Sequence, residues 1–314
     1  PITYSELIAG DILKNLYEGF TDTDEKGAIR PMLALKWEAH PDNLGWRFQL
    51  RPNVKFHTGA TLTARDVKAT FEALLTPANK GGLGVQYLER IVGAADFKAG
   101  KATDLAGVTA VDDLTLDVRF TKPDVLFPIY PFMIFDGAFL KEKGLAGLTT
   151  ASAGTGPFRL GAWKRGVEVA LEAHAAYWDG APKLKGVRFM VVPSDDTAIN
   201  QFTAGDLDLV MLGTEAARRV LRDANLSPRL IKAPVAQITY LGMNQTQFAP
   251  FRDKRVREAF CIALDRPAMV RGIFGGLAEP LSGQITPGIG GYDPTLPQIA
   301  FDRDKARRLF AEAG

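Results

Sequence analysis

Residues 46–75 carry the signals of a strand, a turn and a capped helix in direct succession, and this order limits the folds open to the chain. Trp46 and Phe48 alternate with polar residues in "WRFQLR", which predicts a strand with one buried face. "PNVKFHTG" then supplies turn residues, and "TARDVKATFEALL" predicts a helix that Thr63 caps. His57 therefore falls in the connection between the strand and the helix.

Strands and helices continue along the chain without the regular alternation of βαβ units. Gly205 ends one helical pattern and Asp265 caps another, which Gly275–Gly276 ends. Asp302 begins a last amphipathic helix. This mixture predicts an α/β fold with mixed sheets. Strands are predicted at 114–120, 167–171 and 186–192, and further helices at 196–204, 214–224, 253–263 and 266–274.

Composition excludes several classes of function. The 314 residues, enough for about two domains, carry a formal net charge of +2 and so give no footprint for nucleic acid or an anionic membrane. The single cysteine, Cys261, excludes an intrachain disulfide and a zinc–thiolate cluster. No apolar run approaches the roughly 18 residues of a membrane-spanning helix. The sequence begins in mid-pattern without a secretory leader, which leaves the compartment open.

A search for catalytic chemistry finds no assembled constellation in the sequence. HExxH, GxSxG, Walker A and Rossmann motifs are absent, and His40, His57 and His174 lie in separate turn-like contexts. Asp195 and Asp196 stand at a helix start, where capping explains them. We therefore predict no catalytic residue, no metal site and no cofactor. A hydrolase that uses Asp195 and Asp196 is kept as the enzymatic alternative.

Aromatic residues beside turns favour binding over catalysis. Flat side chains at loop positions suit a cleft that holds a solute without transforming it, although each ring taken alone is more typical of a core. The residues concerned are Tyr87, Tyr130, Phe132, Phe135, Trp163, Tyr177 and Trp178.

Motifs along nearly the whole chain follow one another in a recognisable order. They are "NLYEGFTDTDEKGAIRPMLALKWE" (15–38), "GWRFQLRPNVKFHTGATLTARDVKATFEALL" (45–75), "VTAVDDLTLDVRFTKPDVLFP" (108–128), "GTGPFRLGAWKRG" (154–166), "YWDGAPKLKGVRFMVVPSDDTAINQFTAGDLDLV" (177–210), "YLGMN" (240–244), "FRDKRVREAFCIALDRPAMV" (251–270) and "YDP" with "FDRDKARRLFAEAG" (292–314). In this order they resemble the extracellular solute-binding proteins of family 5, which serve peptide and nickel ABC importers.

The resemblance implies a structural role for the turn around His57. The family carries "FHDG" between its strand and its helix, away from the ligand, whereas this chain has "FHTG" with Thr58 in place of the aspartate. We therefore expect His57 to fix the turn, and another bond to replace any that the aspartate would make.

The fold implied by the resemblance is periplasmic binding protein-like, of type II, cluster C. It has two lobes with mixed sheets, an extra N-terminal subdomain and a cleft that closes on the ligand. Residues 1–150 would form the extra subdomain with an opening segment of lobe I, residues 151–235 part of lobe I, and residues 236–314 the start of lobe II after the hinge crossing. Family members are longer, so lobe II would be incomplete within these residues.

The function implied is that of the substrate-binding component of an ABC importer. It would capture an oligopeptide, a dipeptide or a similar small solute on the periplasmic or extracellular side of the cytoplasmic membrane and hand it to the membrane permease. We expect a monomer that is not an enzyme and binds no nucleic acid. The alternatives are the solute-sensing domain of a regulator, or a binder of a nickel or other metal chelate, an oligosaccharide or an opine.

Positions that match ligand-contacting segments of the family give the predicted binding site. Aromatic rings would supply apolar walls, while backbone groups beside glycines would meet polar atoms of the solute. For "YLGMN" an ordinary crossing strand is an equal alternative. The predicted ligand-binding residues are Tyr87, Tyr130, Phe132, Gly154, Thr155, Gly156, Gly242, Met243 and Asn244.

Overall fold

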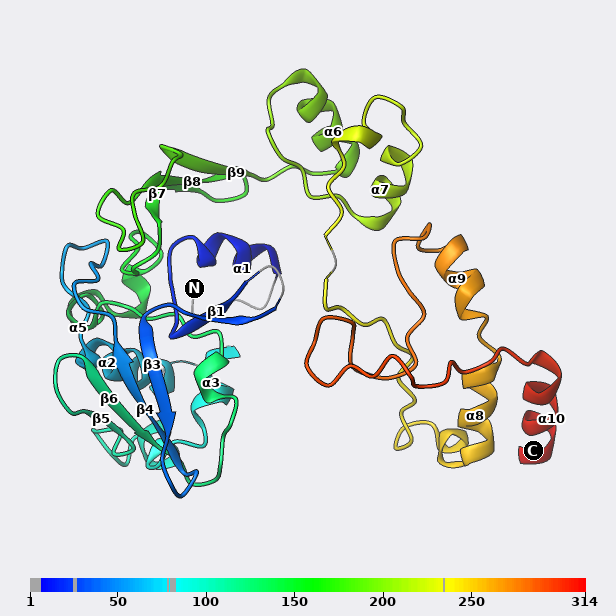
Figure 1. Ribbon diagram of the computed structural model, residues 1–314, viewed down its shortest axis with the longest axis horizontal. Helices are drawn as coiled ribbons and strands as arrows, with labels where there is room; N and C mark the ends of the chain where they lie inside the picture. Colours follow the sequence, from blue (N-terminus) through cyan, green and yellow to red (C-terminus); the bar gives the residue numbers. More distant parts are fainter. Residues whose placement is uncertain (1–6, 25–26, 78, 80–82, 234) are drawn as a thin grey trace. The chain divides into compact units, whose positions relative to one another are not determined.

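The chain forms two compact units, which the ribbon in Figure 1 shows with their helices and strands labelled. Unit 1 comprises Pro1–Val191 and unit 2 comprises Val192–Gly314. The boundary between the units falls inside the predicted segment 151–235, and the finer divisions at 150 and 235 stay predictions. The computed structural model describes residues 7–24, 27–77, 79, 83–233 and 235–314.

A four-stranded antiparallel sheet, in the order β3-β4-β6-β5, is the framework of unit 1. The strand predicted at "WRFQLR" is β4, and its Phe48 lies opposite Leu116 of β6, the strand predicted at 114–120. Alternation puts Phe48 and Leu50 in the core, as the pattern predicts. The strands are β3 (Ala34–Ala39), β4 (Gly45–Leu50), β5 (Val108–Ala110) and β6 (Thr115–Arg119).

Helix α2 (Ala64–Leu75) begins where the sequence predicts. The backbone N–H of Thr63 donates to the Asp66 carboxylate at 2.7 Å, which closes the N-terminal cap. Its apolar face, with Phe71 at the centre, is buried in the same core as Phe48 and Leu50 of β4.

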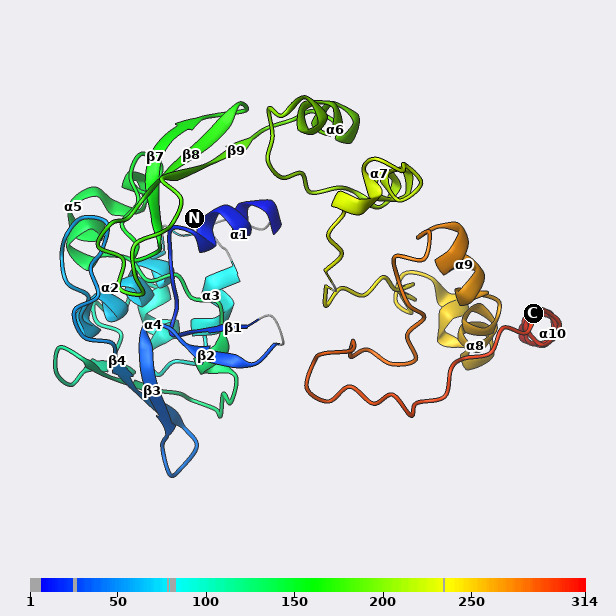
Figure 2. The same ribbon diagram turned by 45° about the horizontal axis from the view of Figure 1, so that its top comes forward.

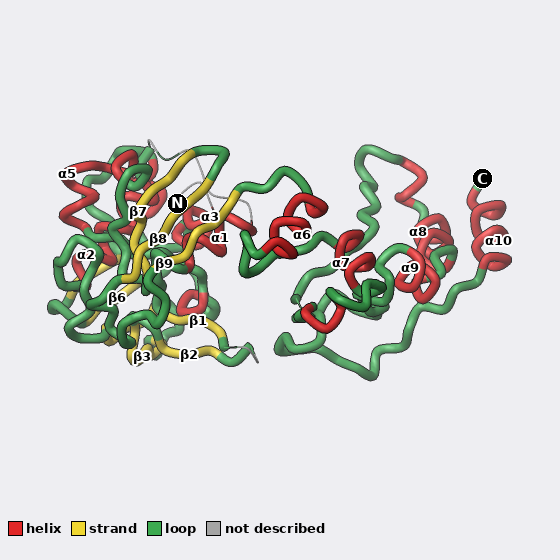
Figure 3. Tube along the Cα trace, turned by 90° about the horizontal axis from the view of Figure 1, so that it is seen from above, coloured by secondary structure: helices red, strands yellow, loops and turns green. Residues whose placement is uncertain are grey.

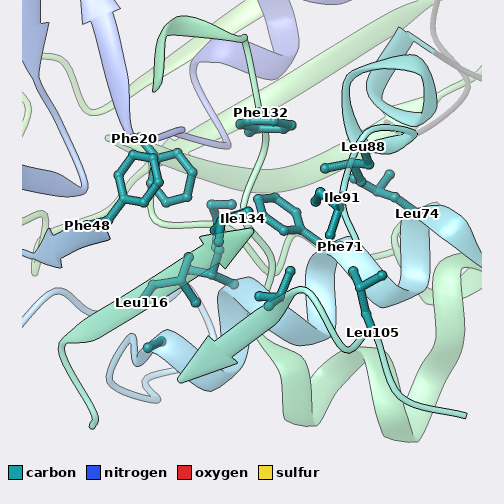
Figure 4. Packing of buried hydrophobic residues seen from close by; sticks show 14 of the residues in the cluster. Phe20, Phe48, Phe71, Leu74, Leu88, Ile91, Leu105, Leu116, Phe132 and Ile134 are labelled. Atoms are coloured by element: carbon teal, nitrogen blue, oxygen red, sulfur yellow. The ribbon is translucent and has the colours of Figure 1, made fainter. Parts of the chain in front are cut away.

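Aromatic side chains fill the centre of this core, as the close view in Figure 4 shows. Phe20 stacks on Phe48 with ring centroids 4.1 Å apart, and Phe71 lies 5.0 Å from Phe132. Phe20 and Phe132 lie in segments outside the sheet, so the core joins the sheet to the connections around it.

A second, three-stranded antiparallel sheet, in the order β7-β8-β9, completes unit 1, and its strands run side by side in Figure 2. Strands β8 and β9 correspond to the strands predicted at 167–171 and 186–192, whereas β7 was not predicted as a strand. The bounds are β7 (Phe158–Lys164), β8 (Glu168–Ala173) and β9 (Gly186–Met190); the other elements of unit 1 are α1 (Leu7–Lys14), β1 (Thr21–Thr23), β2 (Ile29–Pro31), α3 (Leu83–Leu88), α4 (Ala94–Lys98), η1 (Phe127–Ile129) and α5 (Gly137–Gly147).

Unit 2 consists of helices and loops over its described residues, and Figure 3 shows strands only in unit 1. Its predicted helices are confirmed, except that α7 ends at Val220 instead of continuing to 224, because the Asp223 side chain accepts from the N–H of Asn225 and holds a turn there. The elements are α6 (Asp195–Ala204), α7 (Thr214–Val220), η2 (Ser227–Arg229), η3 (Ala249–Arg252), α8 (Lys254–Ile262), α9 (Arg266–Gly272) and α10 (Arg303–Ala313).

The last helix, α10, packs against α8 within unit 2. Asp302 caps it as predicted, through the N–H of Lys305 at 2.8 Å. The Phe310 ring meets Phe260 edge-on at 5.2 Å, and Ala306 is buried. The apolar face predicted for this helix therefore covers α8.

Candidate functional site

The predicted binding residues of unit 1 form two groups that both contact one segment, residues 15–20. The N–H of Gly156 donates to the Leu16 carbonyl at 3.1 Å. The N–H of Ile134, two residues beyond Phe132, donates to the Glu18 carbonyl at 3.0 Å. The structure thus brings the aromatic group and the glycine group together through the backbone that joins α1 to β1.

The aromatic group combines a half-buried pair with a core ring. Tyr87 of α3 stacks on Tyr130 with centroids 4.2 Å apart and planes 18° apart. Phe132 meets both rings edge-on but is only 4% exposed and belongs to the core. The Tyr130 hydroxyl donates to the buried Asp124 carboxylate at 3.0 Å, and burial together with this carboxylate raises the pKa of Tyr130. The tyrosine pair is therefore the part of this group with area left for a ligand.

The glycine group packs too tightly against residues 15–17 to accept larger residues. A Cβ atom on Gly156 would lie 2.5 Å from the Asn15 carbonyl oxygen, and one on Gly154 would collide with the carbonyl oxygen of Leu16. Close approach of two backbones is therefore the structural reason for these glycines. Thr155 between them is fully buried.

A buried carboxylate, Glu18, lies at the centre of this region, and sequence reasoning missed it. Glu18 is 6% exposed and accepts hydrogen bonds from the hydroxyls of Thr155 and Tyr177, both at 2.7 Å. The indole N–H of Trp178 donates to it at 2.9 Å. Burial raises the pKa of Glu18, while the three donors oppose that effect. A charged residue between the apolar residues of "NLYEGF" is the sequence signal that could have found it.

His57 links its turn to the glycine group. Its backbone N–H donates to the Gly154 carbonyl at 2.8 Å, and its ring Nε2 donates to the Gly156 carbonyl at 3.0 Å. His174 approaches the same Gly156 oxygen through Nδ1 at 3.3 Å. Burial lowers the pKa of His57 to about 4, so the ring is neutral near pH 7. The predicted place between strand and helix is confirmed, and the contacts of His57 reach across to a distant loop.

Among the described residues, His57 and His174 acquire no further ligating side chain. No group of three or more histidine, cysteine, aspartate or glutamate residues in that part of the chain is placed to hold a metal ion. Asp195 and Asp196, the enzymatic alternative, also have structural partners: Asp195 accepts from the N–H of Gly213 at 3.2 Å, and Asp196 pairs with Arg219. Both aspartates lie in the first turn of α6, but the cap is Ser194, whose side chain accepts from the N–H of Thr197 at 3.2 Å.

Thr58 stands where the family has an aspartate, and its side chain forms a hydrogen bond with Asp136 from another segment. Its hydroxyl donates to Asp136 at 2.5 Å, and Asp136 caps α5 through the N–H groups of Ala138 and Phe139. Thr58→Val is expected to lower the free energy of unfolding by about 1–2 kcal/mol, because a hydrogen bond to a carboxylate is lost. Thr58→Asp should cost at least about as much at pH 7, since two carboxylates would then face each other.

Urea unfolding of these Thr58 variants checks this prediction, with Thr58→Ser, which keeps the hydroxyl, as the control. Wild-type stability in both Thr58→Val and Thr58→Asp would contradict the assigned contact.

Gly242, Met243 and Asn244 lie in a loop of unit 2, where no strand is formed. The Asn244 side chain accepts from the N–H groups of Thr246 and Gln247, at 3.0 and 2.9 Å, and so shapes the turn that follows. The crossing strand proposed as the alternative for "YLGMN" is not seen. These residues belong to the other unit, so a site that they share with unit 1 stays a prediction.

Comparison with known proteins gives relatives over the whole chain. Oligopeptide-binding protein OppA of Bacillus subtilis is 27% identical over 99% of this chain and 58% of its own length. Glutathione-binding protein GsiB of Escherichia coli is 27% identical over 100% of this chain and 59% of its own length. The chain thus spans about three fifths of the length of these relatives.

Solved structures agree in fold. The murein tripeptide-binding protein MppA, in its unliganded open form, matches with a TM-score of 0.80 and 26% identity, covering 100% of this chain and 63% of that one. AppA of Bacillus subtilis, solved with a nonapeptide, matches with a TM-score of 0.74 and 25% identity over 100% of this chain and 61% of that one. The predicted periplasmic binding protein-like fold is confirmed. Mixed sheets are not seen, because every strand pair among the described residues is antiparallel.

Two further findings concern the described residues and the family profile. None of the helices in the described ranges has the length and apolar character needed to cross a membrane. Residues 28–314 match the profile of the bacterial extracellular solute-binding proteins, family 5 Middle. Since that match covers most of the sequence, the chain belongs to the family 5 extracellular solute-binding proteins of bacteria.

Proposed function

We propose that the whole protein is the substrate-binding component of an ABC importer and captures an oligopeptide, a dipeptide or a similar small solute. The observation that carries this proposal is the family match over residues 28–314, together with relatives named for binding oligopeptides, glutathione and murein tripeptide. It acts as a monomer outside the cytoplasmic membrane, delivers the solute to the membrane permease and does not transform it. The structural partners of its histidines and of Asp195 and Asp196 support binding without catalysis.

In unit 1, we propose that the Tyr87–Tyr130 pair supplies an apolar wall for the solute. In unit 2, we propose residues 242–244 as a source of backbone groups for polar atoms of a solute. The carbonyls of Gly154 and Gly156 already accept from His57, and the N–H of Gly156 already donates to Leu16. These backbone groups are therefore not free to bind the solute, and the glycine group supports the proposed site instead.

Isothermal titration of the whole protein tests this proposal. The panel contains peptides of two to nine residues, glutathione, a nickel–histidine complex, an opine and an oligosaccharide. We expect at least one peptide to bind with a Kd in the micromolar range or tighter. If only a non-peptide solute binds, the ligand belongs to one of the alternative classes. If no member of the panel binds, the proposal is rejected.

The tyrosine pair gives a variant test of the proposed wall. Tyr130→Ala is expected to weaken peptide binding by about tenfold or more, which corresponds to about 1.4 kcal/mol, because it removes a ring from the wall. Tyr130→Phe keeps the ring while losing the bond to Asp124, and is the matched control. Equal affinities of wild type and Tyr130→Ala would remove the pair from the site.

A further inference from the structure

The side chain of Glu18 ties three separate segments of unit 1 together. Its Oε2 accepts from the Thr155 hydroxyl at 2.7 Å and from the Trp178 indole N–H at 2.9 Å, while its Oε1 accepts from the Tyr177 hydroxyl at 2.7 Å. Thr155 lies 137 positions away in the sequence, and Tyr177 lies 159 positions away. One buried carboxylate thus fixes the distance between the α1–β1 connection, the glycine group and the turn after β8.

The partners of this carboxylate are neutral donors, and its own surroundings carry few charges. Among the described residues, Glu18 has no ion pair with a basic side chain, and the charge that faces it is the like charge of Asp179. The guanidinium of Arg51 lies 4.0 Å from the centre of the Trp178 ring. Burying a carboxylate without an ionic partner is costly unless hydrogen bonds compensate it. Glu18 therefore contributes directed hydrogen bonds that an apolar residue could not make.

The backbone beside Glu18 extends this connection to the aromatic group. The Glu18 carbonyl accepts from the N–H of Ile134 at 3.0 Å. A Cβ atom on Gly19 would lie 2.7 Å from the Phe132 carbonyl oxygen, so these two stretches of backbone are in close contact. Tyr130 is two residues before Phe132. Any shift of residues 18–19 is therefore passed to the segment that carries Tyr130.

We infer that Glu18 is a positioning residue of the binding site: its carboxylate holds the glycine group and the Tyr177–Trp178 turn against residues 15–20, and this holds Tyr130 in place for the ligand. Glu18 contacts no ligand itself. This inference rests on the proposed function, because it assigns the ligand to the same site. It predicts that losing the hydrogen bonds of Glu18 lowers ligand affinity even when the protein stays fully folded.

Two substitutions at position 18 separate hydrogen-bond geometry from charge. In Glu18→Gln, the amide oxygen can accept from Thr155 and Trp178 while the amide NH₂ donates to the Tyr177 hydroxyl, which is able to turn and accept. Glu18→Gln should therefore bind a peptide within threefold of wild type. Glu18→Leu makes none of these bonds and should bind at least tenfold more weakly.

Thr155 provides a milder test, in case Glu18→Leu does not fold. Thr155→Val keeps the shape of the side chain and removes one donor, whereas Thr155→Ser keeps the donor and serves as the rescue variant. Thr149→Val is the matched control, because the hydroxyl of Thr149 is exposed and donates to Ala146 within its own turn.

The first measurement needs no ligand and follows hydrogen exchange of the Gly156 and Ile134 amides in the whole protein. Thr155→Val is expected to exchange about tenfold faster at Gly156, and Glu18→Leu about tenfold faster at both amides, while Thr155→Ser and Thr149→Val match wild type. Wild-type exchange at both amides in Thr155→Val and Glu18→Leu would overturn the inference.

The second measurement is the affinity for trialanine, or for glutathione if trialanine does not bind, at a temperature where every variant is folded. A tenfold loss in Thr155→Val that Thr155→Ser restores supports the inference. Unchanged affinity in Thr155→Val, alongside lost affinity in Tyr130→Ala, would show that Glu18 is merely structural. If wild type binds neither probe, the titration panel given above decides the proposed function separately, and the exchange measurement alone decides whether Glu18 holds the two segments.

Discussion

Replacing Phe127 by alanine is expected to lower the free energy of unfolding of unit 1 by about 3–5 kcal/mol. Phe127 is fully buried, and six aromatic rings surround it with centroids between 4.8 and 6.4 Å away. Alanine would remove the ring from the middle of this cluster, and rings supplied by five different segments cannot all move to fill the space. The neighbours are Phe20, Phe48, Phe71, Phe120, Tyr130 and Phe132.

Tryptophan fluorescence during urea unfolding measures this loss in unit 1 specifically, because all four tryptophans of the chain lie there. Val125→Ala, in the same stretch but 75% exposed, is the control and should change stability by less than about 0.5 kcal/mol. A loss below about 1 kcal/mol for Phe127→Ala would contradict the packing described for the core. The tryptophans are Trp37, Trp46, Trp163 and Trp178.

The second large effect is a loss of stability in acid that His57 causes. Its pKa is about 4 in the folded protein, against an ordinary value of 6.5 in the unfolded chain. Between these two values the unfolded chain binds a proton that the folded protein does not, so acid favours unfolding. The stabilisation is complete above pH 6.5 and is lost as the pH falls toward 4, by up to about 3 kcal/mol.

Comparison of wild type with His57→Gln between pH 7 and pH 4 isolates this contribution. The variant lacks the titrating ring, so its stability relative to wild type should rise as the pH falls. Glu18 titrates in the opposite sense, because burial raises its pKa and its protonation favours the folded state, but it is present in both proteins and cancels in the difference. A difference that does not change between pH 7 and pH 4 would show that His57 is not buried as a neutral ring.

Local patterns in the sequence were enough to predict ten of the 22 helices and strands of the described residues, namely α2, α6, α7, α8, α9, α10, β4, β6, β8 and β9. Alternation in "WRFQLR" gave β4, and the Thr63 cap gave α2, because each signal acts between residues a few positions apart. Strand β7 was missed because "FRLGAWK" alternates poorly and only its first residue, Phe158, is buried. The strand β7 forms because its backbone pairs with β8, although its local sequence pattern does not indicate a strand.

Contacts between distant segments could not be predicted from one sequence. Nothing around His57 indicates that it bonds to Gly154 and Gly156, and nothing around Glu18 indicates Thr155 as a partner. Such pairs depend on tertiary packing, which leaves no local periodicity. Even the substitution at Thr58 is explained only once Asp136 is seen beside it.

The predicted binding site stays a prediction, and the structure shows only how its residues pack. The resemblance selected Tyr87 and Tyr130, and the structure places their rings face to face. It also selected Phe132 and Gly156, whose main contacts are with the core and with the backbone of residues 15–17. Motif matching therefore selects candidate residues, and their burial and hydrogen bonding show which of them have surface left for a ligand.

Native mass spectrometry of the whole protein, incubated with an equimolar mixture of peptides of two to nine residues, decides whether the protein binds a peptide without cleaving it. We expect one peptide bound per protein molecule, and release on denaturation of a peptide with its original mass. Peptide fragments among the released products, or a protein that stays free of peptide throughout, would contradict it.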